Sequence, residues 1–287
     1  MWPVFKRQIS TSWVMILGWG LGLGLLGYYM FGIYESFIEQ NISLAEIMAA
    51  MPAEMMAFFG GELDPVSPEG FLTIEFFSYM PVVLGILAIS QASDLITGEE
   101  EDGTLEMVIA QPISRGALFW GKLLALCVNL GLILLITWLG FAIGNEFSDA
   151  FNIGTVDLLN PFVSLFAVLL FITGLALLLS MILPGSKSAN LVAVLYLIAG
   201  YFITSLARID DRLETANLLS PLRYYQTGEA LHGLEPGYLF ILLYFALLFI
   251  LCAWIIFLKR DLHFGITGSM RVALPRREKP LEKEAEK

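Results

Sequence analysis

The sequence predicts an all-α integral membrane protein with six transmembrane helices. Hydrophobic residues make up 57% of the 287 residues and charged residues only 15%, whereas a soluble domain carries about 25% charged residues. The mean hydropathy is +0.74, and the apolar residues form continuous runs rather than the alternating pattern of a membrane strand. Six runs are long enough to cross about 30 Å of hydrocarbon as helices. The predicted spans cover about residues 13–33, 74–95, 118–143, 160–183, 188–208 and 237–258.

The distribution of Lys and Arg predicts the orientation of these spans. Lys6 and Arg7 precede the first span, Arg115 and Lys122 follow the second, and Lys187 lies between the fourth and fifth. The long segment between the first two spans has no Lys or Arg. Basic residues gather on the cytoplasmic side of membrane proteins. We therefore expect both termini, and the segment between spans two and three, to be cytoplasmic.

The two ends of the chain differ in composition. The N-terminal "MWPVFKRQISTSW" mixes aromatic with basic residues, which predicts an N-terminal interfacial helix leading into the first span. An ordinary juxtamembrane tail is the alternative. Residues 1–262 are expected to form a single transmembrane domain. Residues 263–287 combine proline with dense mixed charge, which predicts a disordered cytoplasmic tail.

One glycine pattern imitates a nucleotide-binding motif. The stretch "GLGLLG" at residues 22–27 matches the dinucleotide fingerprint G-x-G-x-x-G, which requires a strand before it and a helix after it. Here it lies in the middle of a predicted span. Glycines spaced four apart on one helix face permit close helix packing in a membrane. We therefore interpret four residues as packing positions, within the subunit or between subunits: Gly18, Gly20, Gly22 and Gly24.

A second pattern imitates a phosphate-binding loop. The stretch "GALFWGKL" at residues 116–123 matches G-x-x-x-x-G-K, but Leu123 stands where Ser or Thr would hold Mg²⁺. Lys122 and Trp120 are more simply explained as anchors at the membrane interface. We expect no cofactor, metal or catalytic residue in this chain. Its two histidines have no neighbouring ligands, and its two cysteines lie in apolar runs.

The segment between spans two and three, "GEEEDGTLEMVIAQPISRGALFWGK" at residues 98–122, has the most specific pattern in the chain. Four consecutive carboxylates, each costing about 2.5–3.5 kcal/mol in hydrocarbon, end the second span and keep the next residues in water. These are Glu99, Glu100, Glu101 and Asp102. Gly103 permits a change of direction after them. Pro112 ends the following segment, and Ser114 is placed to cap the helix that becomes span three.

A short amphipathic helix is predicted within this segment. Thr104 is a suitable N-cap, and Glu106 with the acidic run favours the positive end of the helix. Leu105, Val108 and Ile109 are spaced as one apolar face. Such a helix, linked directly to two spans, is suited to receive a push from a soluble partner. A solvated acidic loop is the alternative, and the agreement of cap, apolar face and stop favours the docking helix.

With these residues the sequence resembles the ABC type-2 permeases, the membrane subunits of bacterial and archaeal ATP-binding-cassette exporters. The matching pattern is an acidic run at 98–101, Gly-Thr-Leu-Glu at 103–106, Pro-x-Ser-Arg at 112–115 and Gly-Lys at 121–122. The stretch "ANLLSPLRYYQTGEAL" at 216–231 is similar to the segment before the last span of that family. The resemblance extends over most of the chain.

The resemblance implies a transport subunit without enzymatic activity, in a bacterial or archaeal plasma membrane. In that family two permeases pair with two separate ATPase subunits, which bind ATP and Mg²⁺, and the helix after span two is a coupling helix that docks on the ATPase. We therefore expect as partners two copies of an ABC ATPase, a second permease in a homodimer, and membrane lipids, but no nucleic acid. The implied coupling interface comprises Glu99, Glu100, Glu101, Asp102, Gly103, Thr104, Leu105, Glu106, Met107, Val108, Ile109, Pro112 and Arg115.

Two other functions stay open. An ion-coupled secondary transporter usually holds ionisable groups within its spans, and the predicted spans are built around runs that contain none. A non-transporting membrane scaffold could use the same architecture. An intramembrane enzyme is disfavoured, because it needs acid, base or nucleophile groups together at membrane depth.

Overall fold

The computed structural model describes residues 1–39, 52, 67–98, 114–148, 150–151 and 153–259. Every regular element among these residues is a helix, and six helical stretches are long and apolar enough to cross a membrane. The prediction of an all-α protein with six spans is therefore confirmed. The stretches are α1 (Trp2–Glu39), α4 to α5 (Pro68–Asp94), α8 (Arg115–Phe147), η2 with α9 (Asp157–Ile182), α10 (Ser186–Leu206) and α12 (Pro236–Lys259).

The first span is one continuous helix from Trp2 to Glu39. The expected interfacial helix is therefore not a separate element but the first turns of α1. Proline is tolerated in the first turn of a helix, where its missing N–H leaves no bond unmade, so Pro3 does not interrupt it. Near the start, the Lys6 ammonium lies 5.4 Å from the centre of the Trp2 ring, and Trp2 and Trp13 are both exposed.

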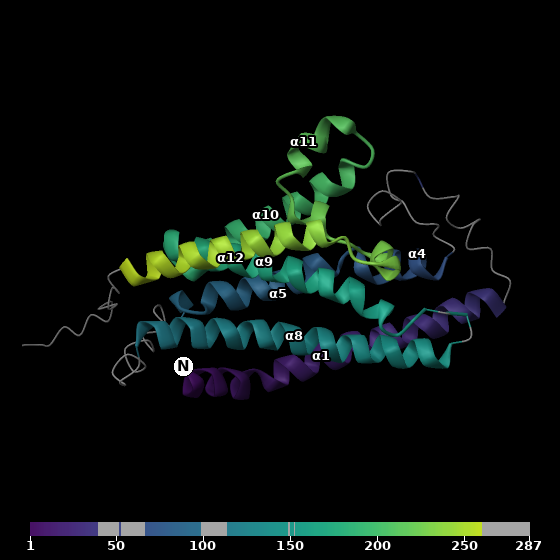
Figure 1. The fold of residues 1–287 in the computed structure, drawn as a ribbon, viewed down its shortest axis with the longest axis horizontal. Helices are drawn as coiled ribbons and strands as arrows, with labels where there is room; N and C mark the ends of the chain where they lie inside the picture. The colour runs from purple at the N-terminus through teal and green to yellow at the C-terminus, as the bar shows by residue number, and fades with distance from the viewer. Residues whose placement is uncertain (40–51, 53–66, 99–113, 149, 152, 260–287) are drawn as a thin grey trace, which may run out of the picture.

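Helices α1 and α8 lie side by side along most of their length (Figure 1). Glycines make this approach possible, because backbone meets backbone where they lie. A methyl group added at Gly140 would overlap the Gly24 carbonyl oxygen, and one added at Gly20 would lie 2.9 Å from Ile136 Cβ. Gly20 and Gly24 thus face α8 within the subunit.

Gly18 and Gly22 are placed differently. No atom lies within 4 Å of a methyl group added at either position. Both line an open groove together with Val14, Met15 and Trp19. The four glycines therefore form two faces of α1, of which only one contacts another part of the described chain.

The helices form two groups: α1 with α8, and α5, α10 and α12 around α9. Helix α9 (Asn160–Ile182) is the centre of the second group. It packs against α5, α10 and α12 and also touches α8. It contains no charged residue, and more than half of its side chains are buried, including Leu165, Val168 and Leu177. A helix that is apolar on all sides is expected at the centre of a membrane bundle.

The second span is not a regular helix throughout. It begins as α4 (Pro68–Leu72), continues as one π-helical stretch, η1 (Thr73–Phe77), and resumes as α5 (Met80–Asp94). The π geometry appears in the bond from the Ser78 N–H to the Thr73 carbonyl, 2.8 Å. Pro81 has no N–H to continue an α-helical ladder from the preceding turn, so the break falls just before it.

An aromatic cluster packs between this irregular stretch and helices α8 and α9. Phe76 and Phe77 each lie against Phe141 of α8 and Phe162 of α9, with ring centres between 4.6 and 6.3 Å apart. Phe31 of α1 joins them through Phe141, at 5.9 Å. This cluster ties both groups of helices together.

The chain after α10 forms short helices that return onto the bundle: η3 (Asp211–Leu213), α11 (Glu214–Asn217), η4 (Pro221–Tyr224) and η5 (Gly228–His232). Figure 1 shows η3 and α11 projecting from the body of the bundle. The later part is fixed by hydrogen bonds to the spans. The Tyr225 hydroxyl donates to the Phe77 carbonyl (3.1 Å), and the Gln226 N–H to Ser164 Oγ (2.8 Å).

The close packing of α1 against α8 can be tested at the contact between Gly24 and Gly140. Gly140→Ala is expected to lower the free energy of unfolding by about 1–3 kcal/mol, because the new methyl group must displace the Gly24 backbone. Gly131→Ala, on the same helix, is the matched control. Its methyl group would lie 3.8 Å from Phe166, in ordinary contact. Denaturation of the two purified variants in detergent measures the difference, and equal stability would contradict the close α1–α8 packing.

Candidate functional site at the junction of α5 and α8

The predicted docking segment is bounded by the end of α5 and the start of α8. Side-chain hydrogen bonds cap the backbone at both of these ends. At the end of α5, Leu95, Ile96 and Thr97 are all buried. The Thr97 hydroxyl donates to the Ser93 carbonyl at 2.5 Å, and so satisfies one of the carbonyls that a helix end leaves free. The chain thus leaves the bundle from a packed and hydrogen-bonded terminus.

At the start of α8, Ser114 is the N-cap. Its side-chain oxygen accepts a hydrogen bond from the Ala117 N–H at 3.2 Å. This confirms the cap predicted from the sequence. Arg115 is the first residue of the helix and is exposed.

Lys122 connects the two helix ends directly. Its side chain is 4% exposed, and its Nζ donates to the Leu95 carbonyl at 2.7 Å. The sequence-based interpretation places Lys122 at the membrane interface, and the structure shows that its side chain points inward to the end of α5. The cation faces inward because the carboxyl end of α5 offers it an unbonded carbonyl and the negative end of a helix dipole.

Aromatic side chains hold the start of α8 against α12. Phe119 lies 5.0 Å from Trp254 and 5.6 Å from Phe257, and Trp120 lies 5.8 Å from Trp254, measured between ring centres. Trp120, also interpreted as an interface anchor, is half-buried in this cluster. One turn of α8 therefore contacts the end of the last span.

The N-terminus of α1 contacts the same turn of α8. A methyl group added at Gly121 would lie 3.0 Å from the Met1 carbonyl oxygen and 3.2 Å from Val4 Cβ. The beginning of the chain, the end of α5, the start of α8 and the end of α12 thus meet at one end of the molecule, on the left in Figure 1. A force on the first turns of α8 would act on three other spans.

Most of the predicted interface residues lie outside the described residues. Glu99 to Ile109 and Pro112 belong to this group, and of the predicted set only Arg115 is described. The structure therefore describes the two ends that would carry a docking segment. It adds Lys122 and Leu95 to the site, a link that sequence reasoning missed because it joins residues 27 positions apart.

The two motif imitations lie where neither can act as a nucleotide loop. Residues 22–27 are in the middle of α1, and residues 116–122 are inside α8 with Lys122 bonded to α5. Both stretches lie within helices, whereas each motif needs a turn between a strand and a helix. In the described parts of the chain no group of three or more His, Cys, Asp or Glu side chains could hold a metal ion.

We call the bond between Lys122 and the Leu95 carbonyl the α5–α8 clamp. The six long apolar helices define a multi-pass membrane protein. Comparison with family models then gives the family. The model of the ABC-2 family transporter proteins matches residues 6–262, which include all six spans. The chain therefore belongs to the ABC-2 family of transporters and is a membrane permease of the ABC transporter class. No curated protein matches the chain.

The clamp can be tested through Lys122. Lys122→Met keeps much of the side-chain volume but removes the bond to the Leu95 carbonyl, so we expect a loss of about 1–3 kcal/mol in the free energy of unfolding. Lys187→Met, which removes an exposed cation at the start of α10, should change it by less than about 0.5 kcal/mol. Denaturation in detergent compares them, and equal effects would contradict the clamp.

Proposed function

We propose that this chain is the membrane-spanning permease of an ATP-driven exporter, and that the segment between α5 and α8 docks on a separate ATPase subunit. The family supports the permease. The observation that carries the coupling is the junction itself, where Lys122 holds the end of α5 to the start of α8. A body that pushed on the connecting segment would move both helices together.

The proposed docking surface is amphipathic. Leu105, Met107, Val108 and Ile109 would supply its apolar contact. The acidic run at 99–102 and Arg115 would form its polar rim, and an apolar centre with a charged rim is typical of protein interfaces. ATP and Mg²⁺ would then be bound by the partner. The proposed assembly has two copies of this chain and two ATPase subunits.

The contacts at this end of the bundle support the coupling proposal. A docking helix transmits force only if its attachment points do not give way. Here α8 is packed against α1 at Gly121, bonded to α5 through Lys122, and held against α12 by Trp254.

An ion-coupled carrier is the weaker candidate. It would be expected to place an ionisable group midway across the membrane. The buried cation Lys122 lies instead in the third turn of α8, where its partner is a helix-end carbonyl. That position suits a structural role better than ion translocation.

Docking is tested by co-purification of the chain with its candidate ATPase. Leu105→Asp combined with Ile109→Asp is expected to lower ATPase retention at least about tenfold, because two charges would replace the apolar centre of the interface. Lys187→Asp combined with Ser188→Asp places two carboxylates in the first turn of α10, on the same predicted side of the membrane, and should retain the ATPase. Retention by both pairs would contradict the docking segment, and absence of the ATPase from wild type would contradict the exporter.

The proposed orientation is tested by cysteine labelling in whole cells. In a background without Cys127 and Cys252, a membrane-impermeant maleimide should label Arg212→Cys in intact cells. Lys187→Cys should be labelled only after the membrane is permeabilised. Both positions are exposed in the structure, so accessibility depends on the side of the membrane. The reverse pattern would place the termini outside.

A further inference from the structure

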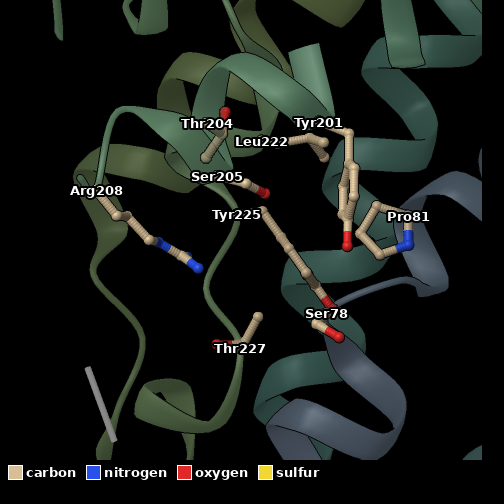
Figure 2. Close-up of a pocket in the computed structure, with 9 residues that line it drawn as sticks. All are labelled: Ser78, Pro81, Tyr201, Thr204, Ser205, Arg208, Leu222, Tyr225 and Thr227. Atoms are coloured by element: carbon tan, nitrogen blue, oxygen red, sulfur yellow. The ribbon is translucent and has the colours of Figure 1, made fainter. Parts of the chain in front are cut away.

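A small polar pocket lies at the opposite end of the bundle from the α5–α8 clamp. Three segments meet there: the break in the second span just before α5, the end of α10, and the segment that returns after α11 (Figure 2). None of them belongs to the proposed docking surface. The lining residues are Ser78, Pro81, Tyr201, Thr204, Ser205, Arg208, Leu222, Tyr225 and Thr227.

The lining has the chemistry of an anion site. It carries one charged side chain, Arg208, and six hydroxyl groups, with no carboxylate among the lining residues. In Figure 2 the Arg208 side chain extends into the space between Ser205 and Thr227. A guanidinium offers five N–H donors in a planar fork that matches the oxygens of a phosphate. The lining therefore favours a negatively charged oxygen ligand.

The nearby carboxylates do not line this pocket, and two of them are engaged elsewhere. Asp210 accepts a hydrogen bond from the Arg212 N–H at 3.0 Å. Glu214 lies 3.8 Å from the Arg223 guanidinium. These two carboxylates thus help to shape the segment that follows α10.

Part of the hydroxyl set holds the walls of the pocket in place. Ser78 donates to the Ile74 carbonyl (3.0 Å), Tyr225 to the Phe77 carbonyl (3.1 Å), and Thr204 to Ser220 Oγ (2.8 Å). Burial raises the pKa of Tyr225 far above its usual value, so it remains a donor at any physiological pH. The pocket is therefore preformed.

Two other hydroxyls are available to a ligand. The side chains of Ser205 and Thr227 form no hydrogen bond with the described part of the chain. Ser205 is 3% exposed as a residue, and both residues line the pocket. A hydroxyl in the lining can donate a hydrogen bond to an oxyanion bound there.

The size of the pocket limits the ligand. The cavity volume is about 30 Å³, and one water molecule needs roughly 10–15 Å³ of such a cavity. The pocket holds a small polar group and excludes an acyl chain. With the orientation proposed above, it opens at the outer surface, beside the phospholipid headgroups.

We propose that this pocket binds the phosphoryl group of an anionic ligand, with Arg208 as the charged contact and Ser205 and Thr227 as further donors. The phosphoryl group is either that of a phospholipid headgroup or free phosphate. Its binding would join the break in the second span to the end of α10 and to the returning segment. The proposal does not depend on the ATPase, since it concerns a different end of the molecule.

The test is titration calorimetry of the purified full chain in maltoside detergent, which contains no phosphate. The probes are dihexanoyl phosphatidylglycerol, dihexanoylglycerol and inorganic phosphate. Wild type is expected to bind a phosphate-bearing probe and not dihexanoylglycerol. Binding of the phospholipid alone identifies a headgroup site, and binding of inorganic phosphate identifies a free-phosphate site. If neither phosphate-bearing probe binds, or if dihexanoylglycerol binds equally well, the proposal is overturned.

Variants then assign the binding to this pocket. Arg208→Gln should weaken it about tenfold or more, because it removes a charge-assisted hydrogen bond. Arg212→Gln is the matched control, since this exposed arginine lies outside the pocket, and it should bind as wild type does. Thr227→Val keeps the charge and should weaken binding about threefold, which decides the matter if Arg208→Gln does not fold. Wild-type affinity in the Arg208 variant, or failing that in the Thr227 variant, would overturn the proposal.

Discussion

Hydrocarbon offers no hydrogen-bonding partner, so every backbone N–H and C=O within the membrane must be bonded inside the protein. This constraint explains why every described span is helical and where irregular backbone is allowed. In the π turn at Thr73–Phe77 the hydrogen bond runs to the carbonyl five residues earlier, as from the Ser78 N–H to Thr73. The returning segment reaches the bundle only because the spans supply partners, Ser164 Oγ for the Gln226 N–H and Thr73 Oγ1 for the Gly228 N–H.

The same constraint explains why Lys122 points toward the end of α5. A helix that ends near the membrane boundary leaves carbonyls without partners, and a buried lysine is costly unless it meets one. Lys122 and the Leu95 carbonyl satisfy each other. The bond that stabilises the helix end also ties it to the next span, so a structural requirement and the proposed transmission of force have one physical origin.

Hydropathy and helix-capping rules predicted much of this architecture, because both depend on local sequence. The six spans follow from apolar runs, and the Ser114 cap from a residue type at a helix start. The inward position of Lys122 was not predictable in this way, since it depends on Leu95, 27 residues earlier. Spacing separates the pair Gly18 and Gly22 from the pair Gly20 and Gly24, but it could not tell that the second pair faces α8 and the first faces open space. The pocket at Arg208 was missed because its lining comes from three distant segments.

Helix α5 links the two ends of the molecule on which the proposals rest. Its carboxyl end is followed at once by Leu95, which bonds Lys122, and its first turn contributes Pro81 to the pocket with Arg208. Fifteen residues of α-helix span about 22 Å, and α5 is packed against α9 and α10 along its length. Under the proposed function, a displacement at the clamp would be passed along α5 to the break around Ser78 and Tyr79. That break forms one wall of the pocket. Under the proposed function, a ligand there would hold the point at which motion from the ATPase side has to emerge.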